Sequence, residues 1–132
     1  MKTSRLHARR QTDMAAQERK LDALWSAQVR ADAGGVCQHC GQPGRIEAAH
    51  IIPRRFKGAR WRLENGLGLE HECHRFFTDH PAAFESWLEQ RFPGLRERLW
   101  TIARTVQIVT PDWLADVAAT LTRCRSTDVG AA

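Results

Sequence analysis

The feature of this sequence that most limits its possible folds is a dense run of metal-ligand side chains in the middle of the chain. Residues 37–80 hold three of the four cysteines and five of the six histidines. A hydrophobic core does not need such groups, because each buried polar atom must find a partner. Cysteine and histidine at close spacing are the usual ligands of zinc and related ions. The sequence therefore predicts a compact module built around metal chemistry, with a proton acceptor beside it.

Length and charge set the broad class. With 132 residues, the chain suits one domain whose core can fold independently if a metal site assists. The formal net charge is +5, and only three of the 20 basic residues are lysines. Arginine binds phosphate through a forked pair of hydrogen bonds, so we expect a nucleic-acid partner. The positive charge by itself has an alternative explanation, which is a basic surface that keeps the protein soluble and binds no nucleic acid.

The cysteines and the N-terminus indicate a cellular location. The first ten residues are polar and basic, unlike a secretory signal, so we expect the reducing cytoplasm. In that setting Cys37-x-x-Cys40 indicates zinc or redox chemistry, and the βαβ pattern that redox chemistry requires is not evident around Cys37. Cys124 stands apart and is interpreted as a buried or unreactive thiol. No apolar run reaches membrane-spanning length, so no membrane partner is expected.

The hydrophobic pattern predicts an α+β fold that is mostly helical. Residues 1–12 lack apolar periodicity and are expected to form a flexible basic arm. An N-terminal helix is expected over residues 13–35, ended by Gly34-Gly35. The metal module occupies residues 36–81 and is expected to contain, in order, a zinc-binding turn, a strand at 45–52, a polar loop, a short strand at 67–69 and a helix at 70–78.

Helices are expected again over residues 82–125, where they serve as scaffold. The first begins at Pro81, and the last has Thr110 as its cap and Pro111 in its first turn. The small residues over 126–132 are predicted to form a disordered tail.

Three motifs stand out in the metal module. They are Ala49-His50-Ile51-x-x-Arg54, Arg60-Trp61-x-x-x-Asn65-Gly66, and Cys73-His74-x-Phe76-Phe77-Thr78-x-His80-Pro81. Together they resemble the HNH (His-Asn-His) endonucleases, the ββα-metal class, and especially their short phage-type members. A His-Asn-His set alone is weak evidence, but Cys37-x-x-Cys40 in front and Cys73 behind make the combination specific.

The resemblance implies three catalytic residues. His50 would be the general base that removes a proton from the attacking water, because imidazole exchanges protons near neutral pH. His74 would bind one divalent ion (Mg²⁺, Mn²⁺, Ni²⁺ or Zn²⁺), which stabilises charge on the phosphate and the leaving oxygen. Asn65 would brace the loop and fix the base through an amide hydrogen bond. If only one of these residues is considered, the alternative to a catalytic role is a polar side chain in the core whose hydrogen bonds are satisfied.

The chain departs from the resembled pattern at its first metal ligand. Many members of the family have histidine or aspartate where this chain has Ala49, although Ala-His occurs in the phage-type subgroup. The ion is therefore expected to rely on His74 and the bound phosphates, with Asn65 or His80 as a substitute ligand. The alternative for His80-Pro81 is a helix-start signal.

A second departure concerns a structural zinc ion. Members of the family usually repeat Cys-x-x-Cys before the helix histidine, but the position three residues before Cys73 is Glu70. We expect Zn²⁺ to bind Cys37, Cys40 and Cys73, with Glu70 or His71 as the fourth ligand. The alternative is that the three cysteines are free thiols packed beneath the helix.

The loop between the two motif residues His50 and Asn65 is strongly basic. We expect it to bind the nucleic-acid backbone, and Trp61 is interpreted as a buried anchor or as a base-stacking group. The basic residues are Arg54, Arg55, Lys57, Arg60 and Arg62.

These observations predict a metal-dependent HNH DNA endonuclease that nicks DNA as a monomer. The first alternative is a zinc-stabilised DNA-binding or phage packaging-accessory protein that has lost catalysis. A third hypothesis is a small zinc adaptor whose partner is a phage packaging protein or another nuclease subunit. In each case the expected location is the cytoplasm, that of a bacterial host if the chain is phage-derived.

Overall fold

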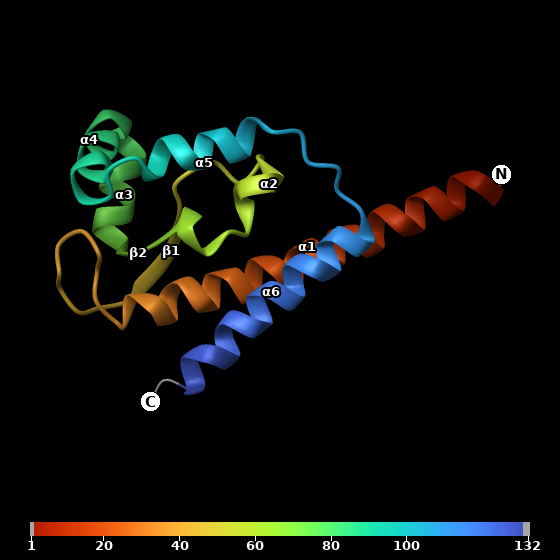
Figure 1. Cartoon of the computed structure of the whole chain (residues 1–132), viewed down its shortest axis with the longest axis horizontal. Coiled ribbons are helices and arrows are strands. Elements are labelled where there is room, and N and C mark those ends of the chain that lie inside the picture. Colours follow the sequence, from red (N-terminus) through yellow and green to blue (C-terminus); the bar gives the residue numbers. More distant parts are fainter. Residues whose placement is uncertain (1, 131–132) are drawn as a thin grey trace. The chain divides into compact units, whose positions relative to one another are not determined.

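A computed structural model describes residues 2–130, in two compact units. The first unit combines the start of the chain, up to Trp25, with the segment from Ile108 onward, and the second is Ser26–Gln107. Helices predominate and the two strands form one small sheet, so the expected mostly helical α+β class is confirmed (Figure 1). The elements are α1 (Lys2–Ala33), β1 (Ile46–His50), α2 (Lys57–Arg60), the 3₁₀ turn η1 (Leu63–Asn65), β2 (Gly66–Glu70), α3 (His71–Asp79), α4 (Pro81–Arg91), α5 (Leu95–Arg104) and α6 (Pro111–Gly130).

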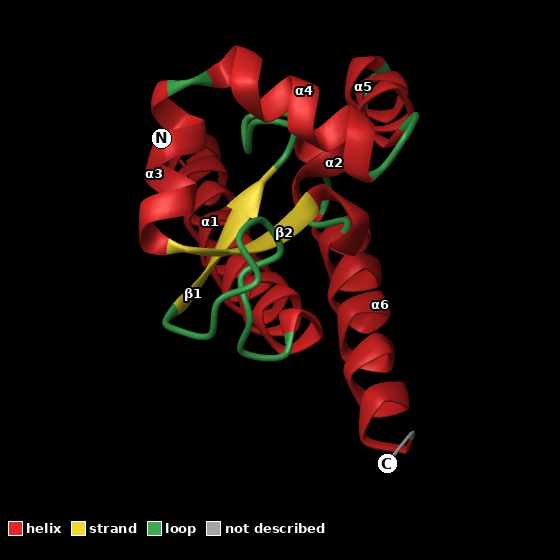
Figure 2. Ribbon diagram, turned by 90° about the vertical axis from the view of Figure 1, so that its left-hand side faces the viewer, coloured by secondary structure: helices red, strands yellow, loops and turns green. Residues whose placement is uncertain are grey.

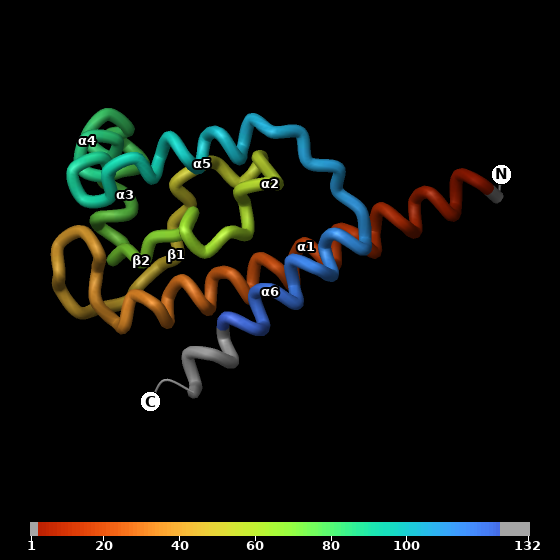
Figure 3. Tube along the Cα trace, in the orientation of Figure 1, coloured from red at the N-terminus to blue at the C-terminus, as the bar shows by residue number. Residues whose placement is uncertain are grey.

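The first helix is longer than the sequence pattern predicted. α1 begins at Lys2 rather than at residue 13, so the stretch expected to be a flexible arm is helical (Figure 3). No glycine or proline interrupts it, and residues of high helix propensity dominate. The side chains of residues 3–12 are exposed, so this part of the helix has no apolar face for a periodicity search to detect. As expected, the helix ends at Gly34 and Gly35, whose φ angles of 66° and 76° favour glycine.

The last helix begins where the sequence predicted. The Thr110 hydroxyl accepts a hydrogen bond from the backbone N–H of Trp113 at 3.1 Å, and Pro111 is the first helical residue. The backbone of α6 remains helical through Gly130, past the start of the predicted disordered tail, because no proline or glycine stops it earlier. Residues 131 and 132 of that predicted tail lie outside the described residues.

Parts of α1 and α6 form the first unit. Leu21 and Trp25 of α1 and Leu114 and Leu121 of α6 are buried. The Gln17 side chain donates a hydrogen bond to the carbonyl of Pro111 at 3.3 Å, which ties the start of α6 to α1. The unit is therefore held by apolar burial along two helices.

A small antiparallel sheet and the helix after it form the centre of the second unit (Figure 2). β1 and β2 pair from Ile46 opposite Glu70 to His50 opposite Gly66. β2 leads directly into α3, with Glu70 as the N-cap, and α3 contacts both strands. The expected order of strand, loop, strand and helix is therefore present, with a first strand shorter than the predicted 45–52.

The remaining helices fix α3 on a hydrophobic core. Phe77 of α3 is buried and lies 5.1 Å from the ring of Phe84 and 5.2 Å from the ring of Trp87, both on α4. Leu88 of α4 and Leu99 of α5 are fully buried in the same cluster. This apolar packing holds α3 against the sheet, as the scaffold role predicted for these helices requires. No helix among the described residues is both long and apolar enough to cross a membrane.

Gly68, in the middle of β2, allows three segments to meet closely. A Cβ atom at this position would lie 2.3 Å from Cβ of Ala33 and 2.9 Å from Cγ2 of Ile46. The backbone of Gly68 also exchanges two hydrogen bonds with Gln38: Gly68 N–H donates to the Gln38 side chain at 2.7 Å, and Gln38 N–H donates to the Gly68 carbonyl at 3.0 Å. The cysteine turn is thereby attached to the sheet through glycine.

Gly68→Ala is therefore expected to lower the free energy of unfolding by about 1–3 kcal/mol, the usual cost of overpacking a rigid site. Chemical denaturation measures the change. The control is Gly44→Ala, where the new Cβ would meet only Cγ of Glu70 at an ordinary 3.6 Å. If Gly68→Ala is as stable as Gly44→Ala, the three segments do not approach as described.

Candidate active site and metal centre

His50 stands at the end of β1 and is held by a backbone carbonyl. Its Nε2 lies 3.0 Å from the carbonyl oxygen of Arg60. A carbonyl only accepts, so Nε2 carries the hydrogen and donates it. In the neutral ring, the lone pair that accepts a proton is then on Nδ1. The contact thus fixes both the tautomer and the orientation of a general-base candidate.

The carbonyl that holds His50 comes from a short helix that the sequence did not predict. α2 occupies part of the expected polar loop, and Arg60 is its last residue. The last carbonyls of a helix have no partner within the helix, so the Arg60 carbonyl can accept from a side chain. Trp61 follows it and is 4% exposed, which confirms the buried-anchor interpretation over base stacking.

Asn65 closes this loop at its base. Its side chain is fully buried, accepts a hydrogen bond from Ile52 N–H at 2.7 Å and donates to the Ile52 carbonyl at 3.2 Å. Ile51 N–H donates to the Asn65 carbonyl at 2.9 Å, which continues the pairing of His50 with Gly66. The hydrogen bond predicted for the Asn65 side-chain amide is therefore made with the backbone of Ile52, two residues beyond His50, and not with His50 itself. Through this contact the amide holds the chain around the base.

The five basic loop residues do not share one environment. Arg54, Arg55 and Arg62 are exposed, and Lys57 is half-buried. Arg60 is only 8% exposed, and its guanidinium lies over the Trp61 ring at 4.8 Å. The expectation that Arg60 binds phosphate is corrected accordingly, because its side chain packs within the loop and is almost fully buried.

Glu47, which the sequence motifs did not single out, joins the sheet to two histidines of α3. Its Oε1 lies 3.0 Å from Nδ1 of His74, and its Oε2 lies 3.1 Å from Nδ1 of His71. Hydrogen bonds to His74 and then to His71 lower the pKa of Glu47, which keeps the carboxylate ionised. Alternation along β1 was the available signal, because it places Glu47 on the same face as position 49.

His80 takes a structural position between two helices. It ends α3 and caps α4, its Nδ1 lies 2.9 Å from the Phe76 carbonyl, and its ring stacks on that of Phe76 at 4.4 Å. These side-chain contacts are with the last turn of α3, and His80 makes no side-chain capping hydrogen bond to α4. They give His80 a role independent of any ion.

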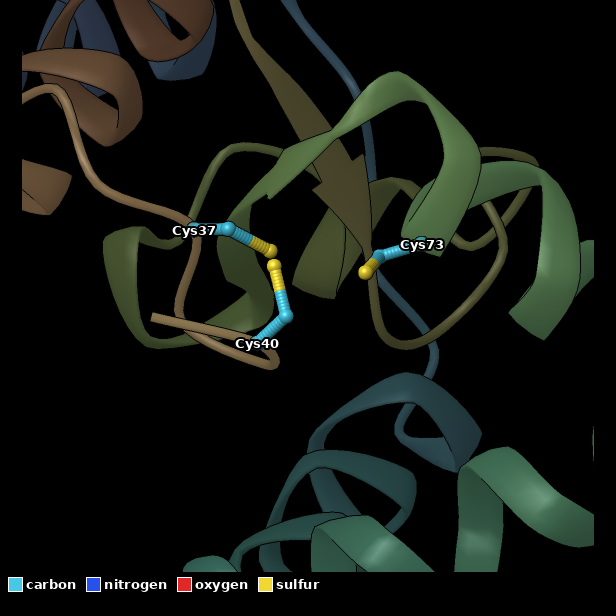
Figure 4. A group of neighbouring side chains, drawn as sticks. All are labelled: Cys37, Cys40 and Cys73. Atoms are coloured by element: carbon cyan, nitrogen blue, oxygen red, sulfur yellow. The ribbon is translucent and has the colours of Figure 1, made fainter. Parts of the chain in front are cut away.

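Three thiols form a candidate metal centre. The Sγ atoms of Cys37, Cys40 and Cys73 all lie within 4.8 Å of one another, with Cys73 facing the other two (Figure 4). Tetrahedral Zn–S bonds of about 2.3 Å would place the sulfur atoms about 3.8 Å apart, so small side-chain movements suffice. The thiols come from the turn after α1 and from the first turn of α3. This cluster could hold a metal such as zinc.

The thiols differ in how readily they ionise. Burial opposes ionisation of Cys37, but backbone hydrogen bonds from Cys40, Glu70 and His39 together lower its pKa. Burial, with the neighbouring thiols of Cys40 and Cys37, raises the pKa of Cys73 to about 12. The neighbouring thiols thus oppose further negative charge at Cys73, and a bound cation would offset that cost.

Neither residue expected as the fourth zinc ligand lies in this cluster. The Glu70 carboxylate accepts from Glu72 N–H at 3.0 Å and caps α3, while His71 faces Glu47. Helix capping directs Glu70, and the first helical turn carries His71 to the strand side. A different histidine, His39, lies near one of the thiols, with its Nδ1 3.3 Å from Sγ of Cys73, although the three-thiol group itself does not include it. The Cys-x-x-Cys spacing itself contained this histidine, and its nearness to Cys73 depends on the fold.

Comparison with known proteins agrees with these motifs and this geometry. Residues 37–85 match the family model of the HNH endonucleases. This match supports the resemblance to the HNH endonucleases seen in the sequence. The match suggests nuclease-type chemistry, and the matched family implies DNA as the substrate class. The search of curated proteins and the search of solved structures gave no match.

Proposed function

We propose that this protein is a metal-dependent DNA endonuclease that hydrolyses phosphodiester bonds, with one active site that nicks a single strand. The observation that carries the proposal is the hydrogen bond between His50 and the Arg60 carbonyl. It prepares a histidine as a proton acceptor at the end of the strand that packs beside α3, the helix bearing His74.

The proposed roles follow from the contacts. His50 accepts the proton of the attacking water at Nδ1, and the Arg60 carbonyl stabilises the resulting imidazolium through Nε2–H. Asn65 is a positioning residue, because its amide holds the Ile52 backbone beside His50. His74 holds the divalent ion, with Glu47 beside it.

The side chains at His74 fit a hard divalent ion, since a carboxylate and an imidazole meet there and remain partly exposed. When bound, such an ion supplies charge stabilisation for the phosphate and the leaving oxygen. Structural zinc is proposed separately at Cys37, Cys40 and Cys73, because thiolates select zinc over Mg²⁺ or Mn²⁺.

Supercoiled plasmid incubated with the zinc-loaded protein tests the function. We expect nicked circles when Mg²⁺, Mn²⁺ or Ni²⁺ is added, and none when the zinc-loaded protein receives no further divalent ion. Intact plasmid under every ion, with protein that is folded and binds DNA, would contradict the proposal.

Exposed arginines of the loop are proposed to bind the DNA backbone. The triple change Arg54→Ala, Arg55→Ala and Arg62→Ala is expected to weaken binding to all sequences. It should also lower the slope of log affinity against log salt by up to about 0.9 for each phosphate that is no longer neutralised, because fewer counterions are released. Fluorescence anisotropy with duplex DNA over a salt series measures both quantities.

The matched control removes three exposed arginines outside the loop, namely Arg19 and Arg30 on α1 and Arg91 on α4. It changes the net charge equally and should leave most of the slope in place. An equal loss of affinity in both triple variants would mean that DNA does not pass over the loop.

A second candidate function is DNA binding without catalysis. The observation that favours it is Ala49, which is 6% exposed in the core and offers no ligand at the position where many HNH proteins have one. If this second function is correct, the triple variant of the loop arginines should still bind DNA more weakly than the parent. No divalent ion should support cleavage by the parent protein.

A further inference from the structure

The missing ligand at Ala49 raises the question of which group replaces it. We propose that Glu47 is a direct ligand of the catalytic divalent ion, paired with His74, and that His71 positions its carboxylate. This inference rests on the proposed nuclease function and specifies the ligand set of that site. It moves His71 from the expected zinc centre to the ion site.

Strand geometry places Glu47 where a substitute is needed. Side chains two residues apart on a strand project from the same face, so Glu47 and Ala49 share one side of β1. The contacts of Glu47 with His71 and His74 show that this side faces α3.

The spacing between Glu47 and His74 suits a shared ion. Two neighbouring ligand atoms of an octahedral ion, each about 2.1 Å from it, lie about 3.0 Å apart. The distance between Oε1 of Glu47 and Nδ1 of His74 is 3.0 Å. An ion bound by both atoms would lie to one side of the line that joins them, so both side chains would turn toward it without moving apart, and the imidazole would then carry its hydrogen on Nε2.

His71 explains why only one carboxylate oxygen is offered. Its Nδ1 contacts Oε2 at 3.1 Å, which leaves Oε1 directed at His74. His71 is thus a positioning residue for Glu47. His71, which the sequence analysis expected at the zinc centre, therefore contacts Glu47 on the side of α3 that faces the strands.

Solvent and substrate can reach this pair. The side chains of Glu47 and His74 are 33% and 36% exposed, so hydrated ions can enter and water and phosphate oxygens can complete the coordination. A fully buried carboxylate–histidine pair would exclude both. The site therefore suits Mg²⁺ or Mn²⁺, which retain several water ligands.

Manganese binding tests the assignment independently of cleavage. The probe is Mn²⁺ titrated into zinc-loaded, full-length protein without DNA, with the free ion followed by electron paramagnetic resonance. We expect Glu47→Gln and His74→Ala each to weaken binding by at least about tenfold. The control is Glu72→Gln, an exposed glutamate of α3, which removes the same charge and should keep the parental affinity.

Glu47→Gln separates ligation from positioning. A glutamine carbonyl can still accept a hydrogen bond from His74 but lacks the charge that a hard ion prefers. Parental Mn²⁺ affinity in Glu47→Gln, or a decrease no larger than in Glu72→Gln, would overturn the assignment even if Glu47→Ala binds poorly. His71→Ala should cause a smaller decrease than Glu47→Gln, and a larger one would reverse the two proposed roles.

The outcome is distinguishable from failure of the nuclease proposal. His50 is proposed as a proton acceptor and not as an ion ligand, so His50→Ala should keep Mn²⁺ affinity whatever happens to cleavage. If Glu47→Gln cleaves DNA at the parental rate and binds Mn²⁺ with the parental affinity, this inference is wrong and the nuclease proposal stands. If the parent binds Mn²⁺ through Glu47 but cleaves no DNA, the nuclease proposal is wrong and the ligand assignment stands.

Discussion

His50→Ala is expected to reduce plasmid nicking by a factor of about 10²–10⁴, the usual contribution of a general base. The physical reason is that the side chain acts on a proton in the transition state and makes little contact with bound DNA. DNA affinity and thermal stability should therefore change little. Single-turnover nicking in Mn²⁺, together with anisotropy and circular dichroism, measures the three quantities.

A matched histidine provides the control. His7 is exposed on the first turns of α1 and is held by Gln11 at 3.0 Å, so His7→Ala should cut at the parental rate. If His50→Ala also cuts at that rate, with contaminating nuclease excluded, the general-base assignment is wrong. The non-catalytic DNA-binding function would not explain that result either, because cutting would persist.

Removal of zinc is expected to unfold much of the second unit. Cys37→Ser should reduce bound zinc well below one ion per chain and lower Tm by about 10 °C or more, because each kcal/mol shifts Tm by about 4–8 °C in a domain of this size. The reason is that a two-stranded sheet is marginal alone, so the free energy of zinc binding serves as folding free energy. Elemental analysis of tag-free protein and thermal melts measure both effects.

The fourth cysteine supplies the control. Cys124 lies on α6, outside the three-thiol cluster, so Cys124→Ser should keep both zinc and Tm. Chelation of the parent should reproduce the Cys37→Ser melt. A parent protein that is fully folded without zinc would show that the three cysteines are packed thiols.

Local signals in the sequence were sufficient for several elements. Thr110 caps α6 and Gly34 ends α1, as predicted, because capping depends on a few neighbouring residues. The HNH motifs also identified the family, since their spacing survives in the sequence whatever the detailed packing. The start of α1 was missed because periodicity reports a buried face, and an exposed helix has none.

Within the candidate site, residue types were predictable but their partners were not. The sequence indicated His50, Asn65, His74 and the three thiols, because each of these residue types is tied to a particular chemistry. It assigned Arg60 to phosphate, whereas the fold uses its backbone carbonyl. Backbone groups carry no sequence identity, so no motif could have revealed that contact.

What the sequence alone determined is thus the class of chemistry: thiols spaced for a metal, a histidine suited to proton transfer, and a family motif that joins them. What only the tertiary structure decided is which groups meet. Pairing of β1 with β2 and the docking of α3 bring Glu47 to His74 across 27 positions of chain, and His39 to Cys73 across 34. Such contacts depend on strand register and helix orientation, which are set by burial of the whole core rather than by neighbouring residues.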